Sequence, residues 1–207
     1  MRKTVVTAFI LIFVLTISVI GAEFITFYDL GNHGWATSAI CRLAEKGVIK
    51  GTAPHYYSPD NYTSKADFAT LLGRLFEIGG NGLSAYPDVP ADSYYTQSVA
   101  ALKALGIIQP DSTGNFNPTD AISRTEAMRW TGFLLERFGF APNIDTSVLE
   151  RFGDSHLVPK ENVKYTAILV EQGFITGDSA GNLNPGGYLT RAETAVILDR
   201  IYTAILE

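Results

Sequence analysis

The chain has 207 residues, 16 basic against 21 acidic, and a formal net charge of −5 at pH 7, which argues against nucleic acid as its partner. A single cysteine, Cys41, excludes an intrachain disulfide, and the length is sufficient for one compact core. An anionic ligand would therefore have to be held by local clusters of basic side chains.

The first 22 residues have the pattern of a targeting segment. Arg2 and Lys3 precede an uncharged run rich in Val, Ile, Leu and Phe, and this run ends on the small residues Gly21 and Ala22. The pattern predicts a signal peptide over residues 1–22. An uncleaved anchor is the alternative, because about 20 apolar residues can span a bilayer. Removal of the segment would leave 14 basic against 21 acidic residues, a net charge of −7.

One short phrase occurs three times: a hydroxyl residue, a cation, and an acid three positions after the hydroxyl. A proline always lies six residues before the cation, a glycine lies eighteen before it, and an aspartate lies a further eighteen or nineteen residues upstream. The spacing between copies is 59 and then 67 residues. The cations are Lys65, Arg124 and Arg191; the glycines are Gly47, Gly106 and Gly173; the aspartates are Asp29, Asp88 and Asp154. The matched spacing predicts a tandem repeat.

Each repeat is predicted to be a helix, a loop and a second helix. The glycine follows an apolar helical pattern and precedes an apolar residue, as in a Schellman C-terminus. The hydroxyl and the acid form a capping box that starts the second helix. The cation is unexpected there, since the positive end of the helix dipole disfavours it. Three such cations predict that something negative lies beside them.

The chain resembles a tandem of three S-layer homology repeats. The resemblance rests on Phe27-Tyr28-Asp29-Leu30 with Trp35, on Tyr86-Pro87-Asp88-Val89 with Tyr94, on Phe152-Gly153-Asp154, and on the glycine loops and capping phrases. It implies an all-α fold with three helix-loop-helix repeats in a pseudo-threefold arrangement around a central helical bundle. The expected repeats are residues 23–79, 83–140 and 152–207, with a linker over residues 141–151 that includes a short helix near its end.

The resemblance also implies that grooves between neighbouring lobes bind an anionic secondary cell-wall polysaccharide, often one with pyruvate ketals. Carried over residue by residue, the expected polysaccharide-binding residues are Lys65, Arg124, Arg191, Asp29, Asp88, Asp154, Trp35, Tyr94, Gly51 and Gly177. The cations would pair with carboxylates, and the aspartates would orient the cations or accept sugar hydroxyls. The two aromatic residues would pack on sugar rings, although anchoring of the first helix is an alternative role for Trp35.

Each copy departs from the family pattern. Repeat 1 has Lys65 in place of arginine, and repeat 3 has Glu161 in place of the aromatic residue. Repeat 2 has Pro110 in place of a glycine and Tyr94 in place of tryptophan. These departures predict that at least one groove is altered.

No catalytic residue, metal site or cofactor is predicted. Residues 177–181 fit the G-x-S-x-G pattern, but the strand before it and the later histidine that a hydrolase needs are both missing. The three histidines are widely separated and have no cysteine partners, which argues against structural zinc. Cys41 matches Ala100 and Ala167 in the other repeats, which favours a buried small residue over a reactive thiol.

The sequence thus predicts a secreted, noncatalytic module that holds its bearer to the cell surface by binding polysaccharide. The alternative is a structural protein of the S-layer or envelope that acts through contacts with other envelope proteins. If the three cations serve only the ligand, replacing all of them with alanine should abolish wall binding and leave the melting temperature almost unchanged.

Overall fold

The computed structural model describes residues 26–80, 86–140 and 143–206, and it contains helices and loops without a β-strand in these ranges. The predicted signal peptide lies outside the described residues. The α-helices are α1 (Gly34–Glu45), α2 (Lys65–Leu75), α3 (Thr96–Ala104), α4 (Arg124–Arg137), α5 (Val163–Glu171) and α6 (Arg191–Leu206). Three 3-10 helices lie between α4 and α5: η1 (Thr146–Arg151), η2 (Ser155–Leu157) and η3 (Lys160–Asn162). The all-α prediction is confirmed, and η1 lies where the short linker helix was expected.

The second helix of each repeat begins at the repeated phrase because a side chain caps it. The Ser123 hydroxyl accepts from the Glu126 amide, and the Glu126 carboxylate accepts from the Ser123 amide in return. Thr190 and Glu193 make the same reciprocal pair. In repeat 1 only the Ser64 half is present, since the shorter Asp67 side chain does not accept from the cap amide.

The first helix of each repeat ends at the predicted glycine. Gly47, Gly106 and Gly173 all have φ between 71° and 76°, a region that costs glycine little. The next amide donates back to a leucine carbonyl in the last helical turn, from Val48 to Leu43 in repeat 1 at 2.9 Å. The apolar residue that follows the glycine is buried in every repeat. These endings confirm the Schellman prediction.

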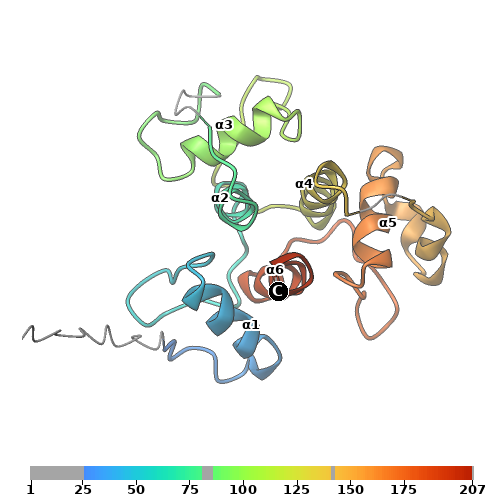
Figure 1. The fold of residues 1–207 in the computed structure, drawn as a ribbon, viewed down its shortest axis with the longest axis horizontal. Helices are drawn as coiled ribbons and strands as arrows, with labels where there is room; N and C mark the ends of the chain where they lie inside the picture. Colours follow the sequence, from blue (N-terminus) through green and yellow to red (C-terminus); the bar gives the residue numbers. More distant parts are fainter. Residues whose placement is uncertain (1–25, 81–85, 141–142, 207) are drawn as a thin grey trace, which may run out of the picture.

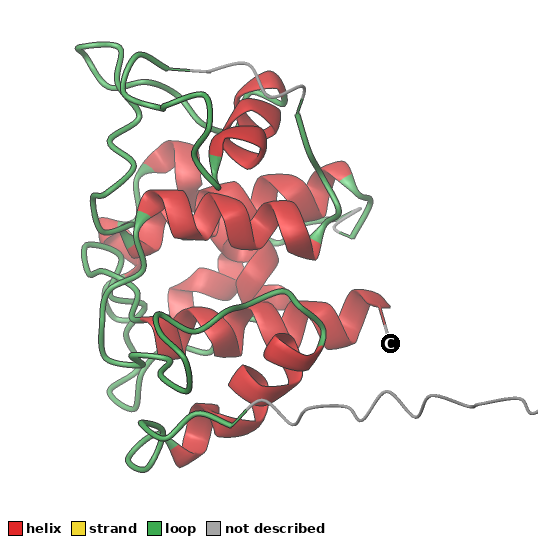
Figure 2. Ribbon diagram, turned by 90° about the vertical axis from the view of Figure 1, so that its left-hand side faces the viewer, coloured by secondary structure: helices red, strands yellow, loops and turns green. Residues whose placement is uncertain are grey.

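The helices that begin at the capping phrases lie at the centre of the molecule. Figure 1 shows α2, α4 and α6 end-on beside one another, with α1, α3 and α5 outside them. Figure 2 shows most of the loops gathered at one end of the helices. The central helices bury large apolar side chains against each other, among them Phe68, Trp130 and Leu198.

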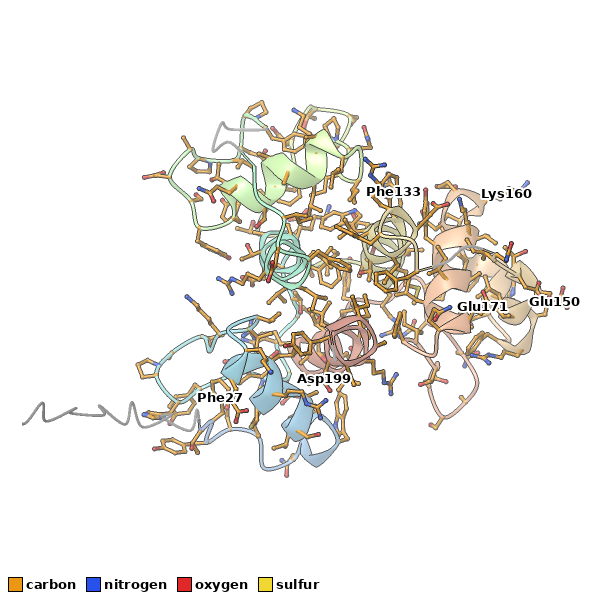
Figure 3. The ribbon with its side chains drawn as sticks, viewed as in Figure 1. Phe27, Phe133, Glu150, Lys160, Glu171 and Asp199 are labelled. Atoms are coloured by element: carbon orange, nitrogen blue, oxygen red, sulfur yellow. The ribbon has the colours of Figure 1, made fainter. Side chains whose placement is uncertain are left out.

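Each outer helix packs on the central helix of the preceding repeat, so that α3 contacts α2, α5 contacts α4, and α1 contacts α6. Glycine permits two of these crossings, α2 with α3 and α4 with α5. A Cβ on Gly73 would collide with Ser98 Oγ, and one on Gly132 would lie 2.6 Å from the Tyr165 carbonyl oxygen. At the α1–α6 crossing the matching residue is Asp199, which pairs with Arg42 at 3.5 Å and lies on the α1 side of α6 (Figure 3). Cys41 on α1 is only partly buried, so the prediction of a buried small residue at this position is wrong in the degree of burial.

Three backbone hydrogen bonds join the repeats in a closed ring just before the central helices begin. The Thr63 amide donates to the Leu189 carbonyl at 2.9 Å, Ile122 to Thr63 at 2.9 Å, and Leu189 to Ile122 at 3.4 Å. The three residues occupy the same position, two residues before each cation. Since every repeat both donates and accepts, each repeat is held by the other two. Within the described residues, no helix is both long enough and apolar enough to cross a membrane.

Candidate binding grooves between the repeats

Two grooves on the surface are built from corresponding residues of different repeats. The first, called here the repeat-1 groove, has a volume of about 440 Å³ and is lined by the glycine loop of repeat 1 and by α2. The second, the repeat-3 groove, has a volume of about 1040 Å³ and is lined by the glycine loop of repeat 3 and by α6. Each also includes an aromatic residue from the following repeat and a cation from the preceding one, counting cyclically. A groove is thus complete only when all three repeats are folded together.

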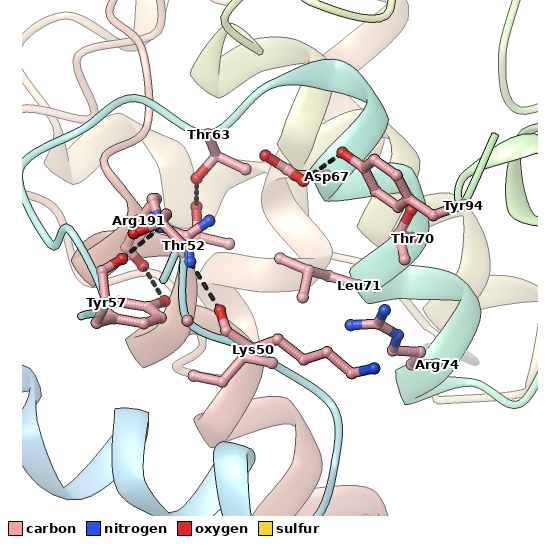
Figure 4. Close-up of a pocket in the computed structure, with 13 residues that line it drawn as sticks. Lys50, Thr52, Tyr57, Thr63, Asp67, Thr70, Leu71, Arg74, Tyr94 and Arg191 are labelled. Carbon is pink, nitrogen blue, oxygen red and sulfur yellow. Dashed lines mark hydrogen bonds between the residues drawn. The ribbon is translucent and has the colours of Figure 1, made fainter. Parts of the chain in front are cut away.

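The repeat-1 groove contains five of the residue types that matter for binding a charged sugar. Gly51 lies in its loop, Asp67 and Arg74 come from α2, Tyr94 comes from just before α3, and Arg191 comes from the start of α6 (Figure 4). The Tyr94 hydroxyl donates to Asp67 Oδ1 at 2.7 Å. Partial burial and this hydrogen bond to a carboxylate both raise the pKa of Tyr94. The phenol therefore stays neutral and remains a donor at physiological pH.

The repeat-3 groove has the same plan. Gly177 lies in its loop, Glu193 and Arg200 come from α6, Trp35 comes from α1, and Arg124 comes from α4. Trp35 is 58% exposed, and its ring lies 6.3 Å from the His33 ring. An exposed indole on the wall of a groove offers a flat apolar face on which a sugar ring can stack.

The three cations of the capping phrases have internal partners. Lys65 Nζ lies 3.3 Å from Glu126 Oε1, and Arg124 Nη1 lies 3.1 Å from Glu193 Oε1. In both pairs the acid belongs to the capping box of the next central helix. Arg191 instead donates from Nε to the Tyr57 carbonyl and from Nη2 to the Lys50 carbonyl, and its guanidinium lies over the Tyr57 ring.

These contacts change the explanation for the cations. The sequence pattern predicts something negative beside the cations, and for Lys65 and Arg124 this partner is a carboxylate of the neighbouring repeat. Arg124 and Arg191 nevertheless line the two grooves. A ligand-binding role for them stays a prediction, whereas their contacts show that they join the repeats.

The three repeated aspartates organise the glycine loops. Asp29 accepts from the Tyr57 and Ser58 amides, Asp88 from Phe116 and Asn117, and Asp154 from Leu183 and Asn184, all at 2.6–3.1 Å. Burial by itself would raise the pKa of Asp29, but its amide hydrogen bonds outweigh this and lower it. The aspartates do not contact the cations directly. Asp29 fixes residue 57, whose carbonyl then accepts from Arg191.

The glycines of the loops allow close approach of neighbouring atoms. A Cβ on Gly51 would lie 2.5 Å from the Tyr56 carbonyl oxygen, and one on Gly177 would lie 2.5 Å from a ring carbon of Phe152. Gly177 also has a φ of +76°. The G-x-S-x-G segment that begins at Gly177 is a turn, in which Asp178 accepts from the Ala180 and Asn182 amides.

The family is decided by comparison with known proteins, because residues 26–69, 85–128 and 151–195 each match the S-layer homology domain. The chain belongs to the S-layer homology domain family. It is 32% identical over 170 residues to the surface-layer 125 kDa protein of Lysinibacillus sphaericus, which covers 81% of this chain and 14% of that protein. It is 28% identical over 183 residues to the S-layer protein sap of Bacillus anthracis, covering 86% of this chain and 21% of that protein.

An enzyme is also among the relatives. The amylopullulanase of Thermoanaerobacterium thermosulfurigenes is 28% identical over 178 residues, which is 84% of this chain and 9% of the enzyme. The chain therefore spans only a small part of each of these relatives. Their similarity establishes the repeats, and it carries no catalytic activity over to this chain. Within the described ranges, no group of three or more His, Cys, Asp or Glu side chains is arranged to hold a metal ion.

The S-layer homology repeats differ in how well they complete a groove. In repeat 2 the positions that match the two grooves have Pro110 in the loop, Lys65 as the cation from the preceding repeat, and Glu161 in place of the aromatic residue. The sequence assigned these three departures to three different repeats. The cyclic arrangement assigns all three to the place in repeat 2 that matches the two grooves, and the departure that remains in those grooves is Tyr94, a tyrosine in place of tryptophan.

Sequence reasoning missed the residues that the central helices supply to the grooves. Arg74 and Arg200 both lie nine residues after the cation of their repeat, and each donates from Nη1 to the carbonyl of the residue after the C-cap glycine, at 3.1 Å. Their shared position was a signal available in the sequence. It was not recognised because both lie inside helices predicted to serve the core.

Proposed function

We propose that this chain is a noncatalytic cell-surface anchoring module whose repeats form a pseudo-threefold unit and bind an anionic secondary cell-wall polysaccharide in the grooves between them. The observation that carries the proposal is the matched construction of the repeat-1 and repeat-3 grooves. A cation, an aromatic residue, an acid, an arginine and a glycine loop recur at equivalent positions in both. Packing of the core does not by itself explain why both grooves place an exposed aromatic residue beside an exposed polar loop.

The groove residues have distinct roles in this proposal. Tyr94 and Trp35 pack against sugar rings, while Arg191 and Arg124 face the carboxylates of a pyruvylated polymer. Gly51 and Gly177 have no side chain, so a sugar can approach the backbone of the loop closely. Asp29, Asp88 and Asp154 hold the loops in shape, and Lys65 belongs to the groove that departs from the pattern.

Several moderate sites on one polymer are sufficient for firm retention. Once one groove is occupied, the second binds a tethered segment of the same chain at high effective concentration. The relatives include surface-layer proteins and an amylopullulanase, which supports a module that serves different cargoes at the cell surface. The predicted signal peptide over residues 1–22 is consistent with a module that acts at the cell surface.

The test is retention by purified cell-wall sacculi before and after chemical removal of the secondary polymer. We expect the chain to bind intact sacculi and to lose binding after removal. A Trp35→Ala, Tyr94→Ala double variant should bind intact sacculi poorly, whereas Tyr28→Ala, another exposed aromatic residue, should bind normally. Retention that ignores the polymer would instead support the alternative, an S-layer or envelope assembly protein acting through protein contacts.

A further inference from the structure

The two grooves and the matching place in repeat 2 differ at two positions that are not among the expected polysaccharide-binding residues. The first lies three residues after the C-cap glycine, where the repeats have Lys50, Gln109 and Thr176. The second lies on the central helix, where they have Arg74, Phe133 and Arg200. The number of cations at this pair of positions is therefore two in repeat 1, none in repeat 2 and one in repeat 3.

In the repeat-1 groove the two cations of this pair are not neutralised. Arg74 is held by one hydrogen bond from Nη1 to the Val48 carbonyl, and Lys50 is exposed. Within the described residues neither side chain forms an ion pair. Figure 4 shows both charged groups in the same part of the groove, pointing toward one another. Two converging cations repel each other, and an anion between them would relieve the repulsion.

The acid of this groove is directed elsewhere. Asp67 is the only carboxylate among the lining residues of the repeat-1 groove, and it accepts from the Tyr94 hydroxyl. The lining thus has three cations, Lys50, Arg74 and Arg191, against one acid that is already hydrogen-bonded. Arg191 is the least available of the three, since two backbone carbonyls accept from it.

The repeat-3 groove has the opposite balance. Its lining contains two arginines, Arg124 and Arg200, against three acids, Asp60, Asp178 and Glu193, and Asp60 contacts the His33 ring nitrogen Nε2 at 2.8 Å. Glu193 compensates Arg124, and the position of Lys50 is taken by the neutral Thr176. This groove is also the larger of the two and has the exposed indole of Trp35. Its chemistry suits a sugar ring without a full negative charge.

We propose that the two grooves are not equivalent: the repeat-1 groove holds a carboxylate of the polymer between Lys50 and Arg74, and the repeat-3 groove holds a less charged sugar unit. The inference rests on the proposed function and adds a subsite for the anionic substituent. This inference transfers the carboxylate contact from Arg124 and Arg191 to Lys50 and Arg74, because Glu193 already pairs with Arg124 and two backbone carbonyls already accept from Arg191. Phe133 and Gln109 leave repeat 2 without such a subsite.

The experiment uses two matched probes, the methyl glycoside of a hexosamine with a 4,6-pyruvate ketal and the methyl ester of the same compound. NMR signals of the Nε–H groups of Arg74 and Arg200 report occupancy of each groove separately. We expect the free carboxylate to shift the Arg74 signal at a lower concentration than the Arg200 signal. The ester should lose this preference, because esterification removes the negative charge of the carboxylate.

Substitutions taken from the other repeats provide the matched variants. Lys50→Thr gives repeat 1 the residue of repeat 3 and should weaken carboxylate binding at Arg74 about threefold, the effect of one exposed ion pair. Thr176→Lys should strengthen carboxylate binding at Arg200 by a similar factor. Arg74→Phe gives repeat 1 the residue of repeat 2 and should weaken binding about tenfold, since a held guanidinium makes a stronger, charge-assisted contact. Lys50 and Thr176 are exposed, so these two variants should melt at the wild-type temperature.

The outcomes separate this inference from the proposed function. Equal binding of the two probes in the repeat-1 groove, or no effect of Lys50→Thr and Thr176→Lys, would overturn the carboxylate subsite even if sacculi retain the chain. Retention by sacculi that does not depend on the polymer would overturn the proposed function, whichever probe binds. A carboxylate preference that moves with the lysine from repeat 1 to repeat 3 supports the inference.

Discussion

Arg124→Ala should destabilise the whole molecule, although its side chain lines a surface groove. The Arg124 side chain is only 11% exposed, and it joins repeat 2 to repeat 3 through Glu193 and through a hydrogen bond from Nε to the Leu183 carbonyl at 2.9 Å. Loss of a hydrogen bond from a charged donor costs about 1.5–3 kcal/mol. The ion pair adds less than about 1 kcal/mol, because Glu193 is 38% exposed and solvent screens it.

The sum is a loss of about 2–3 kcal/mol in the free energy of unfolding, or about 5–10 °C in melting temperature for a chain of this size. Urea unfolding followed by circular dichroism measures it. Arg129→Ala is the matched control, since Arg129 lies on the same helix and forms no ion pair or hydrogen bond through its side chain within the described residues. A double-mutant cycle of Arg124→Ala and Glu193→Gln should give a coupling energy of about 0.5 kcal/mol, the size expected for a partly exposed ion pair. Glutamine is used at residue 193 because it keeps the capping geometry and removes only the charge.

A loss below about 0.5 kcal/mol for Arg124→Ala, equal to that of Arg129→Ala, would refute the reasoning, since that is the range of ordinary surface substitutions. The result also decides how the cations should be understood. The sequence alone predicts that alanine at Lys65, Arg124 and Arg191 leaves the melting temperature almost unchanged. The contacts between repeats predict a clear fall instead, so loss of wall binding in that triple variant must be interpreted together with its stability.

Three further predictions concern the loops and the helix crossings. Asp29→Asn should lower the free energy of unfolding by about 1–2 kcal/mol, because it weakens the hydrogen bonds from the two loop amides. The pKa of Asp29 is lowered in the folded state, so the stability that its carboxylate contributes is present above its unfolded pKa of about 4 and is lost as the pH falls. Urea unfolding should therefore show a smaller loss of stability between pH 5 and pH 2 in the variant than in wild type. Gly177→Ala should cost more than Gly181→Ala in thermal unfolding, because both residues have a φ of +76° but only a Cβ at Gly177 meets Phe152; equal costs would show that the collision is relieved. Gly132→Ala should lower the melting temperature by separating α4 from α5, whereas Gly34→Ala, where a Cβ meets nothing within 4 Å, should not; a wild-type melting temperature for Gly132→Ala would contradict the close crossing.

The sequence by itself determined the repeats and the ends of their helices. Capping by Ser123 or Thr190 and termination at Gly47 depend on residues within a few positions of each other, so a pattern in the chain is enough to predict them. The all-α class followed from the same local signals. The resemblance to S-layer homology repeats added the expectation of grooves and named six of the residues that line them, namely Gly51, Tyr94, Arg191, Gly177, Trp35 and Arg124.

Only the tertiary structure decided which residues share a groove. Each groove combines a loop, an aromatic residue and a cation from three different repeats, and the spacing within one repeat does not show which neighbour supplies which part. For the same reason the departures at Lys65, Pro110 and Glu161 looked like three separate defects until the cyclic packing brought them together. The internal partners of Lys65 and Arg124 were hidden as well, because they lie 61 and 69 residues away, and contacts over such distances are set by how the central helices pack and not by any local preference.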